Sequence, residues 1–228
     1  MLEIGPGGGV LTAQLLAAGA RVWGWELDLE WAAELRRRLP DPRLSVVVED
    51  ALEIGWGRLP APTLAAGNLP YNVATVIIER MLPHHDRVPR AAFLVQKEVA
   101  DRLVARPGDE AYGSLSLLVA AYADARLLGR VRRGSFRPPP KVEGGFVGFE
   151  LRPPPLPPGE MPGLIALIRL AFNQRRKTLR NALSAGWSRE RAAAVLAAVG
   201  LPEKVRGEEL GLAQYVEIHR AAAQHPVA

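Results

Sequence analysis

The sequence predicts an α/β fold followed by a small all-helical domain, and three observations support this. Over residues 1–152, short apolar runs alternate with segments of helical periodicity, which is typical of a largely parallel sheet with helices on both faces. A proline-rich run, RPPPLPPG, follows at 152–159. Beyond it the apolar spacing is helical throughout. We therefore expect a first domain over 1–152, a stiff linker over 153–162 and a helical domain over 163–228.

The first domain is expected to contain alternating strands and helices. Short apolar runs such as RVWGWE indicate strands. Apolar residues three or four apart indicate helices, and the helix over 29–39 carries three arginines near its C-terminus, where cations suit the helix dipole. The expected strands are 1–4, 21–26, 44–49, 63–67, 91–95, 125–131 and 146–151. The expected helices are 10–18, 29–39, 72–81, 97–105 and 114–123.

The prolines of the 152–159 run exclude a helix interior or a central strand there, so this run is expected to be a linker. Ser188 is a suitable N-cap for one of the helices that follow. The expected helices of the C-terminal domain are 163–172, 174–185, 188–199 and 212–223.

The composition excludes several classes of site. The chain has no cysteine, which removes disulfides, thiolate nucleophiles and cysteine-based zinc sites. Its four histidines include no HExxH pair, so no metal site is expected. No apolar run is long enough to span a membrane and no leader is evident, which predicts a cytoplasmic protein.

The charge balance is basic, with a net charge of +5 and a pI near 10.0. All but four of the 29 cations are arginines. Arginine binds phosphate bidentately and stacks on bases, so this bias fits a nucleic-acid partner. It fits a GC-rich genome or a heat-adapted protein equally well. Composition alone therefore leaves the partner open.

A glycine-rich loop follows the first expected strand. It reads Glu3-x-Gly5-x-Gly7-x-Gly9 and precedes a helix, where a cofactor can approach the backbone closely. A dinucleotide fingerprint would need glycine where Val10 stands, and the Gly-Lys-Ser/Thr ending of a phosphate loop is absent. The spacing favours the acidic-G-x-G-x-G loop of a Rossmann-like, S-adenosylmethionine-dependent methyltransferase. Glycines that merely make a tight turn are the alternative.

Two carboxylates end the next strands. Glu26 ends the second strand, where an acid can accept both ribose hydroxyls of a nucleotide. Asp50 ends the third strand, where it can accept from an adenine amino group, and Ala51 follows it. Because ligands bind at the carboxyl edge of a parallel sheet, we expect Glu3, Gly5, Gly7, Glu26, Asp50, Ala51 and Asn68 to bind the cofactor. Either acid alone could equally be a solvated side chain.

A second loop, Asn68-Leu69-Pro70-Tyr71, closes the fourth strand at the same edge. The Asn68 side-chain oxygen and the Leu69 carbonyl can each accept one N6–H of an adenine, which exposes the nitrogen lone pair. Pro70 keeps Leu69 extended, and Tyr71 offers a face for the base. These four residues are the candidate catalytic group. A base inside a duplex cannot reach such a loop, so the target must be flipped or unpaired.

Phe136, in the run FRPPPKV, is a candidate for the second face that holds the base, although a core aromatic is as good an interpretation. Basic residues form two further groups. Arg175, Arg176, Lys177 and Arg180 are the candidate RNA-binding residues. The second group is Arg130, Arg132 and Arg133, for which a solvated face is the preferred interpretation.

With these residues in hand, the chain resembles the ribosomal RNA adenine dimethyltransferase family, in particular its small-subunit branch. The resemblance covers nearly the whole chain. It rests on EIGPG at 3–7, NLPYN at 68–72, QKEV at 96–99, FRPPPKV at 136–142 and FNQRRKTLR at 172–180. The last motif and the helical tail favour the small-subunit branch over the macrolide-resistance branch.

The resemblance implies transfer of two methyl groups from S-adenosylmethionine to each of two adjacent adenosines near the 3′ end of small-subunit ribosomal RNA. The partner is then this RNA or a pre-ribosomal particle, and the chain is expected to be a monomer involved in ribosome assembly. Family members usually carry a segment before the glycine loop that closes over the cofactor, whereas this chain begins inside its first strand. We therefore expect weakened cofactor binding.

Two other functions stay open at this point. A non-catalytic RNA-binding assembly factor could use the same fold, and it would bind RNA in a salt-dependent way without binding cofactor. A DNA adenine methyltransferase typically has Asp/Asn-Pro-Pro-Tyr and a separate recognition domain. Leu69 and the small helical tail both count against the DNA enzyme.

Overall fold

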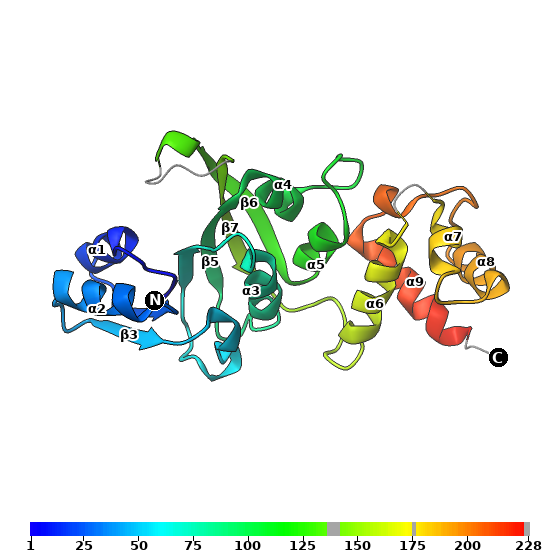
Figure 1. Ribbon diagram of the computed structural model, residues 1–228. Helices are drawn as coiled ribbons and strands as arrows, with labels where there is room; N and C mark the ends of the chain where they lie inside the picture. The colour runs from blue at the N-terminus through cyan, green and yellow to red at the C-terminus, as the bar shows by residue number, and fades with distance from the viewer. Residues whose placement is uncertain (136–141, 175–176, 226–228) are drawn as a thin grey trace. The chain divides into compact units, whose positions relative to one another are not determined.

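The computed structural model describes residues 1–135, 142–174 and 177–225. These residues form two compact units (Figure 1). The first contains Met1–Asp101 and Ala123–Arg152, and the second contains Arg102–Tyr122 and Pro153–Ala228. Residues 102–122, expected within the first domain, thus pack with the C-terminal helices. Most of the apolar side chains of helix α5, Ser114–Tyr122, are buried. This helix packs on α6, Met161–Phe172, and on α9, Leu212–Gln224, of the second unit.

The first unit is built on a seven-stranded sheet of order β3-β2-β1-β4-β5-β7-β6. Strands β1 to β5 pair in parallel, and β7 runs antiparallel between β5 and β6. This confirms the largely parallel, Rossmann-like sheet expected from the sequence. The strands are β1 Leu2–Ile4, β2 Val22–Glu26, β3 Leu44–Val48, β4 Ala65–Asn68, β5 Arg90–Gln96, β6 Ala123–Val131 and β7 Gly144–Leu151.

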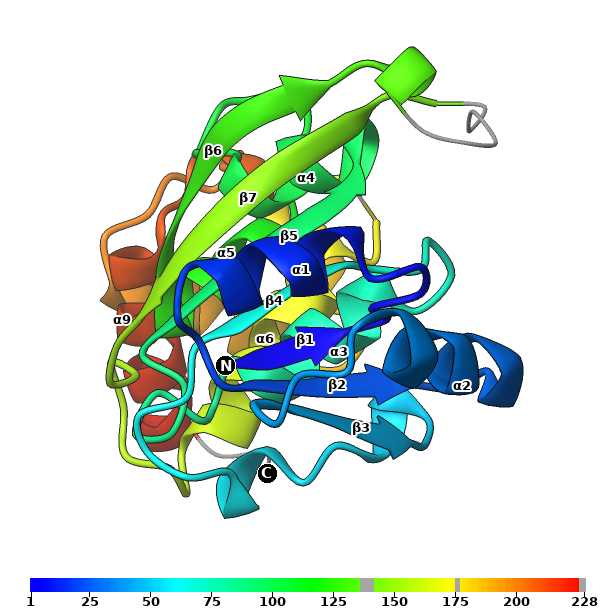
Figure 2. The ribbon, with the colours of Figure 1, turned by 90° about the vertical axis from the view of Figure 1, so that its left-hand side faces the viewer.

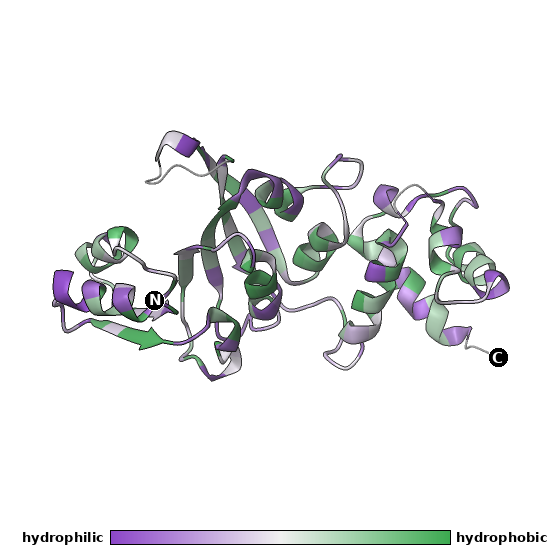
Figure 3. Ribbon diagram, viewed as in Figure 1, coloured by the Kyte–Doolittle hydropathy of each residue, from purple (hydrophilic) through white to green (hydrophobic). Residues whose placement is uncertain are grey.

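Helices cover both faces of this sheet. Helices α1 and α2 lie on one side, while α3 and α4 lie on the other (Figure 2). Ile77, Ile78 and Met81 of α3 are fully buried, and the rings of Phe93 and Phe149 meet at 6.1 Å between their centroids. Exposed α2 is mainly hydrophilic, whereas the central strands are apolar (Figure 3). The helices are α1 Val10–Ala17, α2 Leu29–Arg38, α3 Ala74–Met81 and α4 Lys97–Val104.

The second unit is helical, as expected. Its core centres on Tyr215, which is fully buried and donates its hydroxyl to the Gly207 carbonyl at 3.0 Å. Phe172 stacks on Tyr215 and meets Tyr112 edge-on, and the Tyr112 hydroxyl donates to the Leu210 carbonyl at 2.8 Å. Burial raises the pKa of Tyr112 to about 12, so it stays a neutral donor. The helices are α5 Ser114–Tyr122, α6 Met161–Phe172, α7 Leu179–Leu183, α8 Arg189–Ala198 and α9 Leu212–Gln224.

One expected helix is wrong in extent. The helix expected over 174–185 starts only at Leu179, because Thr178 is extended (φ −62°, ψ 154°) and its side chain caps the helix by accepting from the Asn181 N–H. The Ser188 N-cap is confirmed, since its hydroxyl accepts from the Arg191 N–H at 3.1 Å. Short 3-10 turns that the sequence did not predict lie among the described residues at Ala51–Glu53, Trp56–Arg58, Arg133–Ser135 and Gly207–Glu209.

In the described part of the chain, no helix has both the length and the apolar character needed to cross a membrane.

Candidate active site

The glycine-rich loop lies between β1 and α1 and depends on left-handed backbone. Gly5 and Gly7 have φ of 64° and 48°, a region that other residues enter at a cost. A β-carbon on Gly7 would have no atom within 4 Å, so the space above this residue is open to a ligand. A β-carbon on Gly9 would lie only 2.6 Å from Leu35 of α2. The loop is therefore packed on its inner side and open on its outer side.

Glu26 is held against this loop. Its Oε2 accepts from the Gly7 N–H at 2.9 Å, and its Oε1 accepts from the Asp28 N–H at 3.1 Å. Only 9% of the residue is exposed. Each carboxylate oxygen can accept more than one hydrogen bond, so the group is pre-oriented without being saturated. The backbone thus aims this carboxylate at the open side of the loop.

Glu3 differs from Glu26, because it lies beneath the loop. It is 1% exposed, and its Oε2 accepts from the Thr12 hydroxyl of α1 at 2.7 Å. Burial raises the pKa of Glu3, while the hydrogen bonds from Thr12 lower it. The pair ties the strand before the loop to the helix after it.

Asp50 follows β3 and starts a 3-10 turn. Its Oδ1 accepts from the Leu52 N–H at 2.8 Å, and Ala51 begins the turn. Arg80 of α3 donates to the Leu52 carbonyl and holds the turn in place. Because β3 pairs with β2 up to Glu26, Asp50 and Glu26 end neighbouring strands at one edge of the sheet.

The Asn68–Tyr71 loop lies directly beside the glycine loop. A β-carbon on Gly5 would lie 3.8 Å from the Asn68 carbonyl oxygen. This proximity requires Gly67, since a β-carbon there would lie 2.5 Å from the Ile4 carbonyl oxygen. The sheet therefore brings both loops together at its carboxyl edge.

Within this loop Leu69 is buried, whereas Asn68, Pro70 and Tyr71 are exposed. Asn68 is exposed at the end of β4, whereas Leu69 is 1% exposed and its N–H donates to the Leu94 carbonyl at 3.0 Å. The Pro70 carbonyl accepts from the Ala74 N–H at 3.0 Å and leads the chain into α3. Tyr71 is 38% exposed. The side-chain amide and the phenol ring are thus accessible on an anchored backbone.

The comparisons with known proteins agree with this geometry. The family model described as "Ribosomal RNA adenine dimethylase" matches residues 1–224. The chain belongs to this family. Family membership implies S-adenosylmethionine as the cofactor and confirms the resemblance seen in the sequence motifs.

The curated relatives include two proteins named "Ribosomal RNA small subunit methyltransferase A". The one from Kineococcus radiotolerans is 43% identical and is matched over 99% of this chain and 76% of its own length. The one from Thermobifida fusca is 41% identical, over 96% of this chain and 78% of its own length. These matches confirm the expected small-subunit branch.

Two solved structures share the fold. A dimethyladenosine transferase from Plasmodium falciparum has a TM-score of 0.79 at 24% identity, covering 95% of this chain and 87% of its own. The 23S rRNA methyltransferase ErmE has a TM-score of 0.72 at 25% identity, and the match covers 98% of this chain and 90% of the ErmE chain. The methyltransferase fold with C-terminal helices expected from the sequence is thereby confirmed.

The residues at the sheet edge fit a nucleotide-like cofactor of this family. The space above Gly7 is open, the Glu26 carboxylate is oriented toward it, and Leu27 adds an apolar face. Leu27 directly follows Glu26 and is 66% exposed, which is unusual for a leucine beside a strand end. Sequence reasoning missed both Leu27 and Thr12. An apolar residue just after a strand-terminal acid would have been the signal for Leu27.

Three sequence-predicted site residues lie outside the described residues, namely Phe136, Arg175 and Arg176. Lys177 is exposed, and Arg180 forms an ion pair with Glu203, both in the second unit. Among the described residues, no group of three or more His, Asp or Glu side chains could hold a metal ion.

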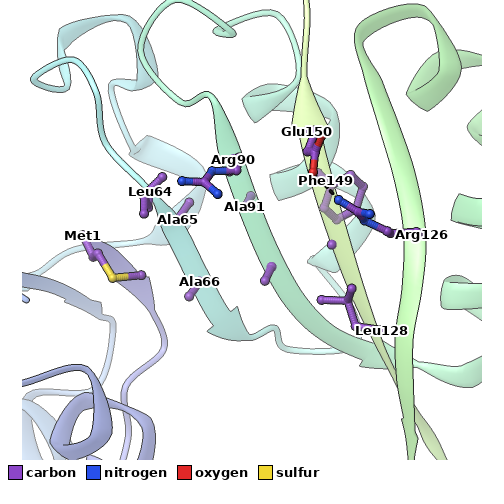
Figure 4. Close-up of a pocket in the computed structure, with 12 residues that line it drawn as sticks. Met1, Leu64, Ala65, Ala66, Arg90, Ala91, Arg126, Leu128, Phe149 and Glu150 are labelled. Atoms are coloured by element: carbon purple, nitrogen blue, oxygen red, sulfur yellow. Dashed lines mark hydrogen bonds and ion pairs between the residues drawn. The ribbon is translucent and has the colours of Figure 1, made fainter. Parts of the chain in front are cut away.

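A hollow of about 320 Å³ lies on the sheet of the first unit, away from both loops (Figure 4). It is lined at the amino ends of β4 and β5, the edge opposite to Asn68 and Glu26. Arg126 and Glu150 form an ion pair at its border. The hollow is therefore separate from the candidate active site.

Proposed function

We propose that this chain transfers methyl groups from S-adenosylmethionine to N6 of adenosines in small-subunit ribosomal RNA, placing two methyl groups on each of two adjacent adenosines near the 3′ end. The observation that carries the proposal is the contact between the glycine loop and the Asn68 loop at one edge of the sheet. Family membership and the small-subunit names of the relatives support it. The RNA is bound alone or within a pre-ribosomal particle.

The glycine loop and its neighbours would bind the cofactor, which supplies an activated methyl group on a positively charged sulfur. Glu26 accepts from the ribose hydroxyls, and Asp50 with Ala51 borders the adenine, which rests on Leu27. Gly5 and Gly7 allow close approach of the ligand to the backbone. Glu3 acts through Thr12 by keeping this loop in shape.

The Asn68 loop would bind the target base. The Asn68 side-chain oxygen and the Leu69 carbonyl accept the two N6–H groups, which turns the nitrogen lone pair toward the methyl donor. Pro70 keeps Leu69 extended, and Tyr71 stacks on the base for about 1–3 kcal/mol. Phe136 is proposed for the opposite face. The base must be unpaired or flipped to enter.

The reaction needs no general base before methyl transfer. With S-adenosylmethionine bound, the N6 lone pair would form the new C–N bond, and the sulfur would keep the electron pair of the C–S bond that breaks. The positively charged amine then loses its proton to water. A second round repeats these steps on the monomethylated nitrogen. The chain's own contribution is to position the amine and to exclude water.

Arg175, Arg176, Lys177 and Arg180 are proposed to bind RNA phosphates, and Arg180 would have to exchange its ion pair with Glu203 for a phosphate. We further propose that the chain acts as a monomer in the cytoplasm, where its ribosomal substrate is assembled.

The test is methyl transfer from labelled S-adenosylmethionine to under-methylated small ribosomal subunits, with mass spectrometry of the nucleosides. The wild-type chain is expected to form N6,N6-dimethyladenosine, and Asn68→Ala is expected to lose it. Gln14→Ala is the matched control, because it removes an exposed side-chain amide from α1 at a position outside the proposed contacts. Binding to the particle without transfer by the wild-type chain would instead support a non-catalytic assembly factor.

A further inference from the structure

Two adjacent arginines follow the last residue of strand β6 in the first unit. Arg132 directly follows the strand, and Arg133 begins the 3-10 turn Arg133–Ser135. Both side chains are exposed. Their sequence context favours a solvated face, but their surroundings in the folded chain point to a binding role.

Three other arginines in the described part of this two-stranded segment form ion pairs with acids. Arg126 pairs with Glu150, Arg130 with Asp101 at 3.1 Å, and Arg152 with Asp124 at 3.4 Å. By contrast, neither Arg132 nor Arg133 forms an ion pair within the described residues. Every Asp and Glu of the chain lies in that described part, so no acid side chain of this protein remains to neutralise them.

These arginines lie at the same edge of the sheet as the target-base loop, Asn68–Tyr71. Strand β6 runs in the same direction as β5, since both are antiparallel to β7, so its carboxyl end shares the edge that carries Asn68. Val131 pairs with Gly144, which pairs with Gln96, two residues beyond the Leu94 partner of Asn68. Three strand spacings separate β4 from β6, which is about 14 Å. Figure 2 shows β6 leading to this same edge.

The surface between the Asn68 loop and the end of β6 carries both positive and negative side chains. Lys97, Glu98, Asp101 and Glu143 line a hollow together with Arg133, and the Lys97 ammonium is held by Asp101 at 2.7 Å. These carboxylates repel a phosphate from the hollow itself. The guanidinium groups of Arg132 and Arg133, which form no ion pair within the described residues, are therefore the favourable place for an RNA backbone at this side of the loop.

We infer that Arg132 and Arg133 bind phosphates of the RNA strand that carries the target adenosine, a few nucleotides from the base held by Asn68. This inference rests on the proposed function and extends it. The strand runs along the carboxyl edge of the sheet, from β4 across β5 and β7 to the end of β6. Forked guanidinium groups suit phosphate oxygens, and contacts of this kind orient the strand without reading its sequence.

The experiment measures the affinity of the full chain for a labelled RNA hairpin whose loop holds two adjacent unpaired adenosines, at a series of salt concentrations. Each phosphate contact to single-stranded RNA contributes about 0.7 to the slope of log K against log salt. The double variant Arg132→Gln/Arg133→Gln is expected to lower this slope by about 1.4. The control is Arg126→Gln, which removes one positive charge from an exposed, paired arginine at the other end of the same strand. It is expected to leave the slope unchanged.

The outcomes separate this inference from the function on which it rests. A double variant whose slope matches that of Arg126→Gln would overturn the inference, even if the wild-type chain methylates small subunits. A lowered slope, with unchanged melting temperature and with kcat unchanged at saturating particle, would support it. If the wild-type chain neither methylates the particle nor binds the RNA in a salt-dependent way, both the proposed function and this inference fail.

Discussion

Replacing Thr12 with valine removes the hydroxyl that donates to Glu3 and keeps the shape of the side chain. Both residues are buried, at 0% and 1% exposed, and the hydrogen bond measures 2.7 Å. A buried acceptor left without its donor costs about 1–3 kcal/mol, and a charged one costs more. For a chain of this size each kcal/mol lowers the melting temperature by about 2–4 °C. Thr12→Val is therefore expected to be clearly less stable than the wild type.

The loss of stability is expected to depend on pH. Burial raises the pKa of Glu3, and the Thr12 hydrogen bonds oppose this. A carboxyl whose pKa is higher in the folded state contributes stability at low pH that is lost as the pH rises through the folded-state pKa. Thr12→Val raises that pKa further, so its loss of unfolding free energy relative to the wild type grows as the pH rises above the ordinary pKa of a glutamate. As the pH falls toward the ordinary pKa of a carboxyl group, this difference in unfolding free energy becomes smaller.

The measurement is urea unfolding of wild type, Thr12→Val and Thr12→Ser at pH 5 and pH 8, with calorimetry of S-adenosylmethionine binding at pH 8. Thr12→Ser keeps the donor and loses only a buried methyl group, about 0.8 kcal/mol at either pH. It should retain cofactor affinity, which Thr12→Val should lose in part. If the two variants have the same stability at both pH values, or bind cofactor equally well, the positioning role of this pair is refuted.

Two other substitutions test how the loops are built. Gly67→Ala is expected to destabilise the chain by about 1–3 kcal/mol and to weaken cofactor binding, because its β-carbon would lie 2.5 Å from the Ile4 carbonyl oxygen. Gly129→Ala, which meets no atom within 4 Å, is the control, and equal melting temperatures for the two variants would contradict the prediction. Tyr71→Ala is expected to weaken binding of the RNA hairpin by about 1–3 kcal/mol, while Tyr71→Phe keeps the ring and the affinity. The affinity for the hairpin is measured by fluorescence anisotropy. If Tyr71→Phe binds the hairpin as weakly as Tyr71→Ala, the ring does not stack on the base.

Much of the candidate site was predictable from the sequence because it depends on local order. Parallel strands bring their carboxyl ends to one edge, so Glu26, Asp50 and Asn68 were expected together once the strands were placed. The glycine loop was likewise visible from its spacing. The helix over 174–185 was placed wrongly, because Thr178 can cap a helix or lie within one, and its sequence context does not decide between them.

Other features required contacts between distant residues. The α5 helix, Ser114–Tyr122, has the apolar sequence of any buried helix, and only its packing on α6 and α9 assigns it to the second unit. The burial of Glu3 under the loop depends on Thr12 of the next element. No pattern of single residues distinguishes that buried carboxylate from the oriented one of Glu26.

The sequence by itself determined the order of strands and helices, the two loops at the sheet edge and the family to which they point, because propensity, spacing and connectivity are properties of neighbouring residues. The tertiary structure decided which charges are neutralised. Asp101 meets Arg130 from 29 residues away, and Glu150 meets Arg126 from 24. Arg132 and Arg133, in the same run of arginines, form no ion pair within the described residues. Electrostatic pairing depends on distance in space, and a chain fixes that distance only when it folds.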